Sequence, residues 1–281
     1  MSELIRLADV GVDYPISGQK TRKVLEDVNL TIRTGEFVAV CGQTGCGKST
    51  MLRMILGAEK PTHGKVLIDG VELPRPDRNR GYVPQKYSLF PDKTVLGNIA
   101  FGPEMEEFGI VGRLSPRYLR RRREIRSEAY RLLAQMGLQE SDSTKYPDQL
   151  SGGMQQRVAI AQALIMRPKI LLMDEAFSAL DPGTRTEMQR LIRSIWAGDG
   201  TTILFVTHNI AEAVFLANRV VVLGKDSPAG SSRVLLDLEI PEECRTSSGY
   251  PRRDELERLT RVIEGAAVGA QPELRLVEFG G

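Results

Sequence analysis

Nine consecutive residues, 42–50, have the residue types and the spacing of a phosphate-binding loop. They read Gly-Gln-Thr-Gly-Cys-Gly-Lys-Ser-Thr, and the first eight follow the pattern G-x-x-x-x-G-K-S. Glycines let the backbone approach phosphate oxygens closely, with N–H groups directed at the anion. Lys48 would reach the β- and γ-phosphates of a nucleotide, and Ser49 would place its hydroxyl on Mg²⁺. A chance glycine-rich turn is the alternative, but every fixed position of the pattern is filled. The candidate nucleotide-binding residues are Gly42, Gln43, Thr44, Gly45, Cys46, Gly47, Lys48, Ser49 and Thr50.

Two adjacent carboxylates follow an unbroken apolar run at residues 170–173, a pattern typical of a central parallel strand. Ligands bind beyond the carboxyl ends of the strands in an open α/β sheet, so both acids would face a bound nucleotide. Asp174 would hold Mg²⁺, directly or through water, and Glu175 would polarise the water that attacks the γ-phosphate. Two acids that only cap the next helix are the alternative, and the phosphate loop upstream favours the catalytic interpretation.

His208, one of two histidines, ends the next apolar strand at residues 201–207. Its position at a strand end matches that of Asp174, which favours a contact with the γ-phosphate over a purely structural role. His63 lies in a predicted turn, and we expect it at the surface.

Ser151, Gly152 and Gly153 open a helix and predict a second anion site. Free N–H groups, the positive end of the helix dipole and the lack of bulky side chains all suit an anion. One chain that holds one triphosphate has no obvious use for this second site.

Short apolar and periodic segments predict the elements that would position these residues. The run 37–41 before the phosphate loop suits a buried strand, and residues 51–56 after it suit a helix. Segments 4–14 and 24–40 indicate strands of an antiparallel sheet. The other expected strands lie at 66–68, 71–73, 81–85, 220–224 and 234–236. The other expected helices lie within 95–137, at 151–167, from 181 to 196 with Gly198 closing, from 209 through 217, and at 254–263.

The composition is ordinary for a globular protein, with 281 residues of which 41% are hydrophobic and 26% charged. This length allows one large domain or two small ones, and a net charge of +2 gives no basis for nucleic-acid binding. Three cysteines form neither a disulfide framework nor a metal-ligand spacing, and Cys46 in the phosphate loop predicts a reducing compartment. We expect no signal peptide and no transmembrane segment, because no apolar run approaches roughly 20 residues.

Six arginines form a basic run within the predicted helical region. A solvated helix face is the simpler interpretation, and contact with anionic lipid headgroups or an acidic partner is the alternative. The members of the run are Arg117, Arg120, Arg121, Arg122, Arg123 and Arg126.

Taken in order, these motifs resemble the nucleotide-binding subunit of ATP-binding cassette (ABC) transporters over residues 4–240. The resemblance implies an α/β fold, a P-loop NTPase (RecA-like) core with an antiparallel β subdomain and an inserted α-helical subdomain. It implies an ABC ATPase domain over residues 1–240, with the helical subdomain at about 92–158. Residues 241–281 would form a C-terminal extension of a loop, one helix and a mobile tail.

The resemblance also implies a head-to-tail dimer of two ATPase subunits. Ser151, Gly152, Gly153 and Gln155 of one subunit would close over the ATP held by the phosphate loop of the other. In this arrangement, the second anion site of one subunit would bind the ATP held by the other subunit.

Further residues receive roles from the same resemblance. Tyr14 would stack on adenine, Gln85 would be the hinge glutamine that senses the γ-phosphate and Mg²⁺, and His208 would be the switch histidine. Residues 178–181 would communicate across the dimer, and residues 86–94 would receive the coupling helix of a membrane subunit. The implied catalytic residues are Glu175, His208, Gln85 and Lys48, and the implied Mg²⁺ ligands are Ser49, Gln85 and Asp174.

Two residues depart from the usual family pattern. Ala176 follows the catalytic acid where the family usually has proline, which would loosen the turn without removing a functional side chain. Cys46 is a common variant in the phosphate loop and predicts sensitivity to thiol reagents.

Within the family, the chain looks most like the ATPases of nitrate, sulfonate, taurine and bicarbonate importers. Residues 80–85, 89–91, 94–98, 177–181 and 207–217 carry this similarity. The implied partners are a second ATPase subunit, a separate integral membrane permease and, through it, an extracytoplasmic solute-binding protein, with no nucleic acid. The chain would then work on the cytoplasmic face of the cell membrane with ATP and Mg²⁺.

Three other functions stay open at this point. The chain could serve an exporter or lipid transporter, act as a soluble cassette ATPase on DNA or the ribosome, or bind nucleotide without turnover. The lack of a second cassette or coiled-coil insert disfavours the soluble ATPase, and Glu175 with His208 disfavours a module without turnover.

Overall fold

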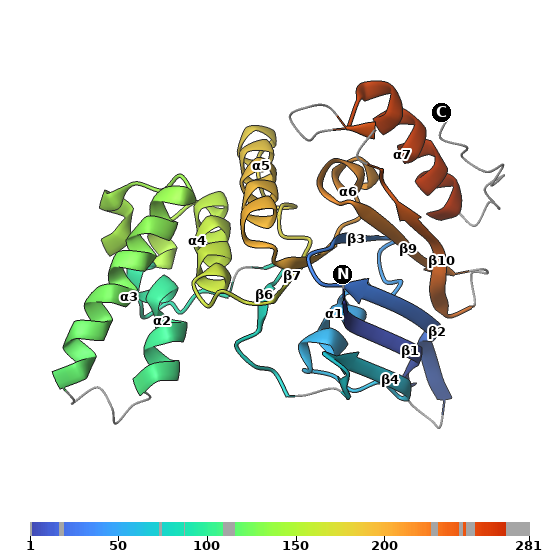
Figure 1. Ribbon diagram of the computed structural model, residues 1–281, viewed down its shortest axis with the longest axis horizontal. Coiled ribbons are helices and arrows are strands. Elements are labelled where there is room, and N and C mark those ends of the chain that lie inside the picture. Colours follow the sequence, from blue (N-terminus) through green and yellow to red (C-terminus); the bar gives the residue numbers. More distant parts are fainter. Residues whose placement is uncertain are drawn as a thin grey trace. The chain divides into compact units, whose positions relative to one another are not determined.

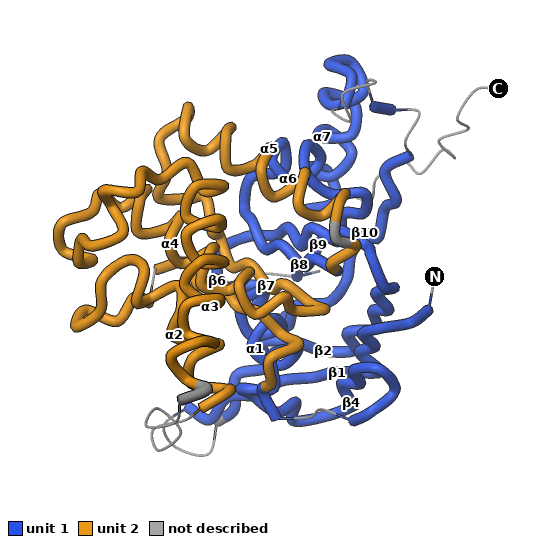
Figure 2. The backbone as a smooth tube through the Cα atoms, turned by 60° about the vertical axis from the view of Figure 1, so that its left-hand side comes forward, with its two compact units in different colours: residues 1–76, 202–281 blue, residues 77–201 orange. Residues whose placement is uncertain are grey.

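The computed structural model describes residues 2–16, 20–72, 75–86, 88–108, 116–225, 230–241, 244–245 and 251–267. The chain divides into two compact units (Figure 2). Unit 1 contains residues 1–76 and 202–281, and unit 2 contains residues 77–201. The strand predicted at 71–73 is described only to residue 72. The predicted tail beyond residue 267 lies outside the described residues.

Unit 1 is built on strands in the order β5-β4-β1-β2-β10-β9-β3-β8 (Figure 1). The antiparallel part was predicted, and β1 (Glu3–Ile16) pairs antiparallel with both β2 (Lys20–Arg33) and β4 (His63–Ile68). The other strands are β3 (Phe37–Cys41), β5 (Val71–Glu72), β8 (Thr202–Val206), β9 (Arg219–Lys225) and β10 (Ser232–Glu239).

The last part of segment 24–40 was wrongly predicted to be antiparallel. The structure separates it as β3, which pairs parallel with β8 and β9. All five residues of β3 are buried, as expected of a parallel strand that is covered on both faces. A turn at Gly35, where φ is +80°, ends β2 and allows the chain to change direction.

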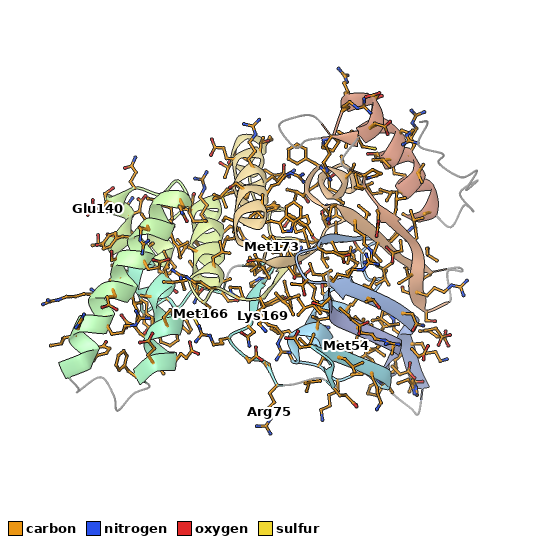
Figure 3. The ribbon with its side chains drawn as sticks, viewed as in Figure 1. Met54, Arg75, Glu140, Met166, Lys169 and Met173 are labelled. Carbon is orange, nitrogen blue, oxygen red and sulfur yellow. The ribbon has the colours of Figure 1, made fainter. Side chains whose placement is uncertain are left out.

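Three helices belong to unit 1: α1 (Lys48–Leu56), α6 (Ile210–Leu216) and α7 (Arg253–Ala267). Met54 of α1 is fully buried (Figure 3). α1 ends at Gly57 in the left-handed conformation that closes many helices. α7 confirms the helix predicted at 254–263 and continues to Ala267.

Unit 2 contains two parallel strands, β6 (Arg80–Val83) and β7 (Ile170–Asp174), paired from Arg80↔Ile170 to Val83↔Met173. Its helices are α2 (Val95–Phe108), α3 (Pro116–Gln135), α4 (Gly152–Leu164) and α5 (Pro182–Asp199), with short 3₁₀ turns at Glu140–Thr144 and Pro147–Gln149. α2 packs on α3 and α4, so much of the range 92–158 is helical. The boundaries of the helical subdomain stay a prediction.

One predicted helix end was wrong. Gly198 lies inside α5, and the helix ends instead at Gly200, whose φ is +64° and whose N–H donates to the Trp196 carbonyl at 3.2 Å. Among the described residues, none of the helices is both long and apolar enough to cross a bilayer.

Candidate functional site

The phosphate loop lies between β3 and α1, as predicted, and two of its glycines are required by close packing. A Cβ on Gly42 (φ +154°) would lie 2.0 Å from the Leu223 carbonyl oxygen. A Cβ on Gly47 (φ +96°) would lie 2.6 Å from Leu25 Cδ2. The loop backbone therefore sits directly against β2 and β9, where a side chain has no room.

Lys48 is folded back against this loop. Lys48 is only 5% exposed, and its Nζ donates to the carbonyls of Gly42 at 2.7 Å and Gln43 at 3.0 Å. A buried ammonium needs such acceptors to offset its desolvation. A phosphate oxygen is a charged and therefore stronger acceptor, so Lys48 can exchange the carbonyls for a nucleotide without leaving the loop.

Cys46 is 4% exposed, and burial raises the pKa of its thiol. Burial also raises the pKa of the Cys41 thiol to about 12. A reactive cysteine needs both access and thiolate character, and Cys46 has neither. These features argue against the sensitivity to thiol reagents that the sequence suggested.

Tyr14 lies on β1, and its hydroxyl is held by α1 and the residues after it. It donates to Glu59 and lies 3.3 Å from Thr50 Oγ1, and Arg53 Nη2 donates to it at 3.4 Å. Arg53 Nε also pairs with Glu59 at 2.9 Å. The hydroxyl is thus tied to the helix of the phosphate loop.

In unit 2, the predicted residues Asp174, Glu175 and Gln85 come together at the ends of β6 and β7. Gln85 Nε2 donates to Glu175 Oε2 at 2.9 Å. Asp174 is buried at the end of β7 and accepts from the Tyr82 hydroxyl at 3.4 Å. Sequence reasoning missed Tyr82, although it lies three residues before Gln85 on the strand that pairs with β7.

Glu175 has φ +45°, in the left-handed region that few residues other than glycine adopt. Such strain concentrates at functional positions. Ala176 is buried, and the Ser178 N–H donates to the Glu175 carbonyl at 3.0 Å. The turn after the acid is therefore hydrogen-bonded even though proline is missing.

The predicted second anion site lies at the start of α4. Ser151 is its N-cap, and its hydroxyl accepts from the Met154 N–H at 3.3 Å. Gly152 and Gly153 form the first turn. Gln155 Nε2 instead donates to the carbonyls of Pro147 at 2.8 Å and Leu150 at 3.2 Å, so it holds the loop that leads into the helix.

Residues 178–181 lie next to this helix start. A Cβ on Gly153 would lie 3.4 Å from Leu180 Cδ2. Asp181 caps α5, and the N–H of Thr184 lowers the pKa of its carboxyl. Arg185, which sequence reasoning missed, donates to the Leu180 carbonyl at 3.0 Å and so fixes this segment.

His208 is exposed in unit 1, on the short loop between β8 and α6. Neighbouring hydrogen bonds fix the loop: Thr207 Oγ1 donates to Glu212 Oε2 at 2.6 Å and accepts from the Asn209 N–H at 3.0 Å. Asn209 Oδ1 in turn caps α6 by accepting from the Glu212 N–H at 3.0 Å. An Asn followed three residues later by Glu is a helix-start signal that could have identified these supports.

Four arginines of the basic run, Arg120, Arg121, Arg122 and Arg126, pair with acids. Arg121 bonds to Glu107 and Glu124, and both Arg122 and Arg126 lie within ion-pair distance of Glu104. This favours an ion-paired helix face over a free binding patch.

Residues 90–94 of the segment predicted to receive a coupling helix are held in place by Asn98. Asn98 is 0% exposed, accepts from the Phe90 N–H at 2.7 Å and donates to the carbonyls of Phe90, Lys93 and Thr94 at 3.0–3.1 Å. Phe90 itself is 36% exposed. Asn98, which sequence reasoning did not single out, thus presents Phe90 at the surface.

The predicted site residues are divided between the two units. The phosphate loop, Tyr14 and His208 lie in unit 1, whereas Gln85, Asp174, Glu175 and the start of α4 lie in unit 2. Unit 1 offers backbone donors and an ammonium for phosphates, and unit 2 offers two carboxylates for a metal ion and a water.

Comparison with known proteins gives matches over most of the chain. A family model described as ABC transporter matches residues 25–178. The nitrate import ATP-binding protein NrtD of Synechococcus elongatus is 43% identical over 83% of this chain and 81% of its own length. The aliphatic sulfonates import ATP-binding protein SsuB of Bacillus cereus is 35% identical over 93% of this chain and 91% of its own.

A solved structure shows the same fold. It is a dimeric post-hydrolysis state of an ATP-binding cassette bound to ADP and Pi, 34% identical to this chain. The match has a TM-score of 0.71 and covers 85% of this chain and 99% of that one.

Proposed function

Because the chain belongs to the ABC transporter family, we propose that it is the ATP-hydrolysing subunit that powers uptake of a small solute of the nitrate, sulfonate, taurine or bicarbonate type. The relatives named for nitrate and aliphatic sulfonate import support this solute class. One observation supports the proposal that Glu175 is catalytic. Its backbone is in the left-handed conformation at the end of a buried strand, and its carboxylate accepts a hydrogen bond from Gln85 at 2.9 Å.

We propose that ATP binds with Mg²⁺. The loop N–H groups and Lys48 would take the phosphates, and Tyr14 would stack on the base. Among the described residues there is no cluster of three or more His, Cys, Asp or Glu that could hold a metal. Mg²⁺ is usually bound through one or two carboxylates together with substrate phosphates and water, and the residues that we propose as its protein ligands are Ser49, Gln85 and Asp174.

Hydrolysis would need Glu175 to be free to polarise water. In the structure Gln85 holds the carboxylate, and we propose that Gln85 turns to Mg²⁺ and the γ-phosphate when nucleotide is engaged. That exchange would release Glu175 for the attacking water, with His208 contacting the γ-phosphate.

The active form would be a head-to-tail homodimer, which the dimeric relative bound to ADP and Pi supports. Ser151 and the N–H groups of Gly152 and Gly153 would contact the γ-phosphate bound by the partner. A shift from mostly open to mostly closed needs roughly 5.5 kcal/mol of differential affinity. Several charge-assisted hydrogen bonds of about 1.5–3 kcal/mol each can supply it.

Transport would require a separate membrane permease and, through it, an extracytoplasmic solute-binding protein. Phe90, presented by Asn98, would lie in the surface that receives the permease on the cytoplasmic face of the membrane. Extraction in mild detergent tests this: a permease with a solute-binding protein should co-purify. A permease that never carries a binding protein would favour export, and a ribosome or DNA complex would overturn transport.

The catalytic assignment is tested with Glu175→Gln and a matched control, Glu140→Gln, at an exposed residue that begins a 3₁₀ turn of the same unit (Figure 3). E175Q keeps the shape of the side chain but cannot act as a base, so we expect ATP binding to persist and turnover to fall at least 100-fold, in the range of general-base catalysis of about 10²–10⁴. E140Q should hydrolyse ATP at the wild-type rate. Normal turnover by E175Q would show that another group is the base.

A further inference from the structure

The described residues after β10, at 240–241, 244–245 and 251–267, support unit 1, although no sequence motif gives them a function. α7 packs on α6, β9 and β10, and it lies beside α6 in both views (Figures 1 and 2). Leu259, Ile263 and Ala266 form its buried face, spaced as one side of a helix. The extension therefore holds the helix that follows His208.

Arg245 makes the most specific contact between this extension and α6. It is 7% exposed, and its guanidinium donates to the carbonyls of Phe215, at 3.3 Å, and Ala217. These carbonyls belong to the last turn and the C-cap of α6, where backbone acceptors lack partners within the helix. A cation at this end also interacts favourably with the helix dipole.

Arg245 is itself held in place. It forms a β-bridge with Pro251, and the Arg252 N–H donates to the Cys244 carbonyl at 2.8 Å just before α7 begins. The Ile240 N–H donates to the Asn218 carbonyl at 2.8 Å, so the chain is also anchored directly after β10. The Arg245 guanidinium thus links the residues that lead into α7 to the C-terminal end of α6.

His208 lies two residues before the other end of the same helix. α6 has 7 residues and is therefore about 10 Å long. Ala213, Val214 and Leu216 are fully buried along it. A short helix that is packed in this way moves as a unit, so a shift at its C-terminal end reaches the loop that carries His208.

We propose that Arg245 is a positioning residue that fixes α6 from its C-terminal end and thereby sets the position of His208. The inference rests on the proposed role of His208 at the γ-phosphate. The C-terminal extension would then contribute to ATP hydrolysis through the guanidinium of Arg245.

The test compares Arg245→Met, which keeps the aliphatic stem but loses both hydrogen bonds, with Arg253→Met. Arg253 lies on α7 with a side chain that is 94% exposed. We expect kcat for ATP hydrolysis to fall about tenfold in R245M, with KM for ATP changed less than about twofold, because a misplaced group that acts in the transition state lowers kcat. R253M should match the wild type. A folded R245M with wild-type kcat would overturn the proposal.

A spectroscopic readout separates positioning from a general loss of stability. The chain has two histidines, so a ¹H–¹³C spectrum of the imidazole Cε1–H groups contains two signals, which H63Q assigns. R245M should shift the signal of His208 and leave that of His63 in place. If R245M does not fold, Arg245→Gln takes its place, since it stays polar but lacks the cationic fork that spans both carbonyls, and an unmoved His208 signal in that folded variant would overturn the proposal.

The His208→Ala background distinguishes this inference from the proposed function. If Arg245 acts through His208, H208A/R245M should be no slower than H208A alone, because the positioned group is gone. Multiplied losses in the double variant would overturn the inference. Wild-type turnover by H208A would overturn the role of His208 itself, while the His208 signal in R245M would still decide whether Arg245 positions that residue.

Discussion

At the scale of single residues, the ring and the hydroxyl of Tyr14 are expected to have separate roles. The hydroxyl is tied to Glu59, Thr50 and Arg53, whereas the ring is the part proposed to stack on adenine. Tyr14→Ala should weaken ATP binding by about 5- to 150-fold, since aromatic–base stacking is worth about 1–3 kcal/mol. Tyr14→Phe should bind ATP within about twofold of the wild type but unfold more easily, by about 1 kcal/mol. Nucleotide titration and urea unfolding measure the two effects, with half-exposed Tyr130→Phe as the control. Unchanged affinity in Y14A would remove the ring from the site.

Residues that act through short patterns were predictable, and residues that act through distant backbone atoms were not. Three motifs indicate their chemistry by residue types that lie within a few positions of each other. They are the phosphate loop, the two acids after 170–173 and the Ser-Gly-Gly helix start. Arg245 binds carbonyls 28 and 30 residues earlier in the chain. Asn98 and Arg185 hold loops through backbone acceptors only 4 to 8 residues earlier, but these contacts follow no recognised motif. The sequence around Arg245 contains no trace of its contacts, since the fold alone brings these atoms together.

At the scale of elements, two glycines near the end of α5 should respond oppositely to alanine. Gly198 lies inside the helix with nothing within 4 Å of its Cβ position, so Gly198→Ala should stabilise the protein by about 0.5–1 kcal/mol. Gly200 is left-handed at the C-cap, so Gly200→Ala should cost about 1 kcal/mol or more. Thermal unfolding of both variants measures the difference. Destabilisation by G198A would instead support the helix end that the sequence alone suggested.

Element identity was predicted better than element partners. The pattern of apolar residues located β3, but its partners β8 and β9 lie more than 160 residues further along the chain, as in Phe37↔Ile203. Segment 24–40 therefore looked like a continuation of the antiparallel hairpin, and only tertiary pairing separates β3 from β2. The end of α5 was misjudged for a related reason: both Gly198 and Gly200 can end a helix, and φ decides between them.

At the scale of the whole molecule, a head-to-tail dimer predicts that two inactive variants restore each other. Lys48→Ala disables the phosphate loop but keeps Ser151 and Gly153, whereas Gly153→Asp disables the helix start but keeps the loop. In a mixed dimer, one of the two composite sites combines the intact loop of one subunit with the intact helix start of the other. Random pairing makes half of the dimers mixed, so the mixture should regain roughly a quarter of the wild-type ATPase activity, provided that each site works alone.

The matched control uses two variants that fail in the same half of the site. Lys48→Ala mixed with Glu175→Gln should stay inactive, because in the proposed dimer the loop and the general base of each site come from one chain. ATPase rates at several mixing ratios measure both pairs, and restored activity should peak at equal amounts. Recovery in the K48A and G153D mixture alone would support composite sites shared between subunits. No recovery in either mixture would contradict a composite site that works alone, and the second anion site at Ser151 would then need another use or a second intact site beside it.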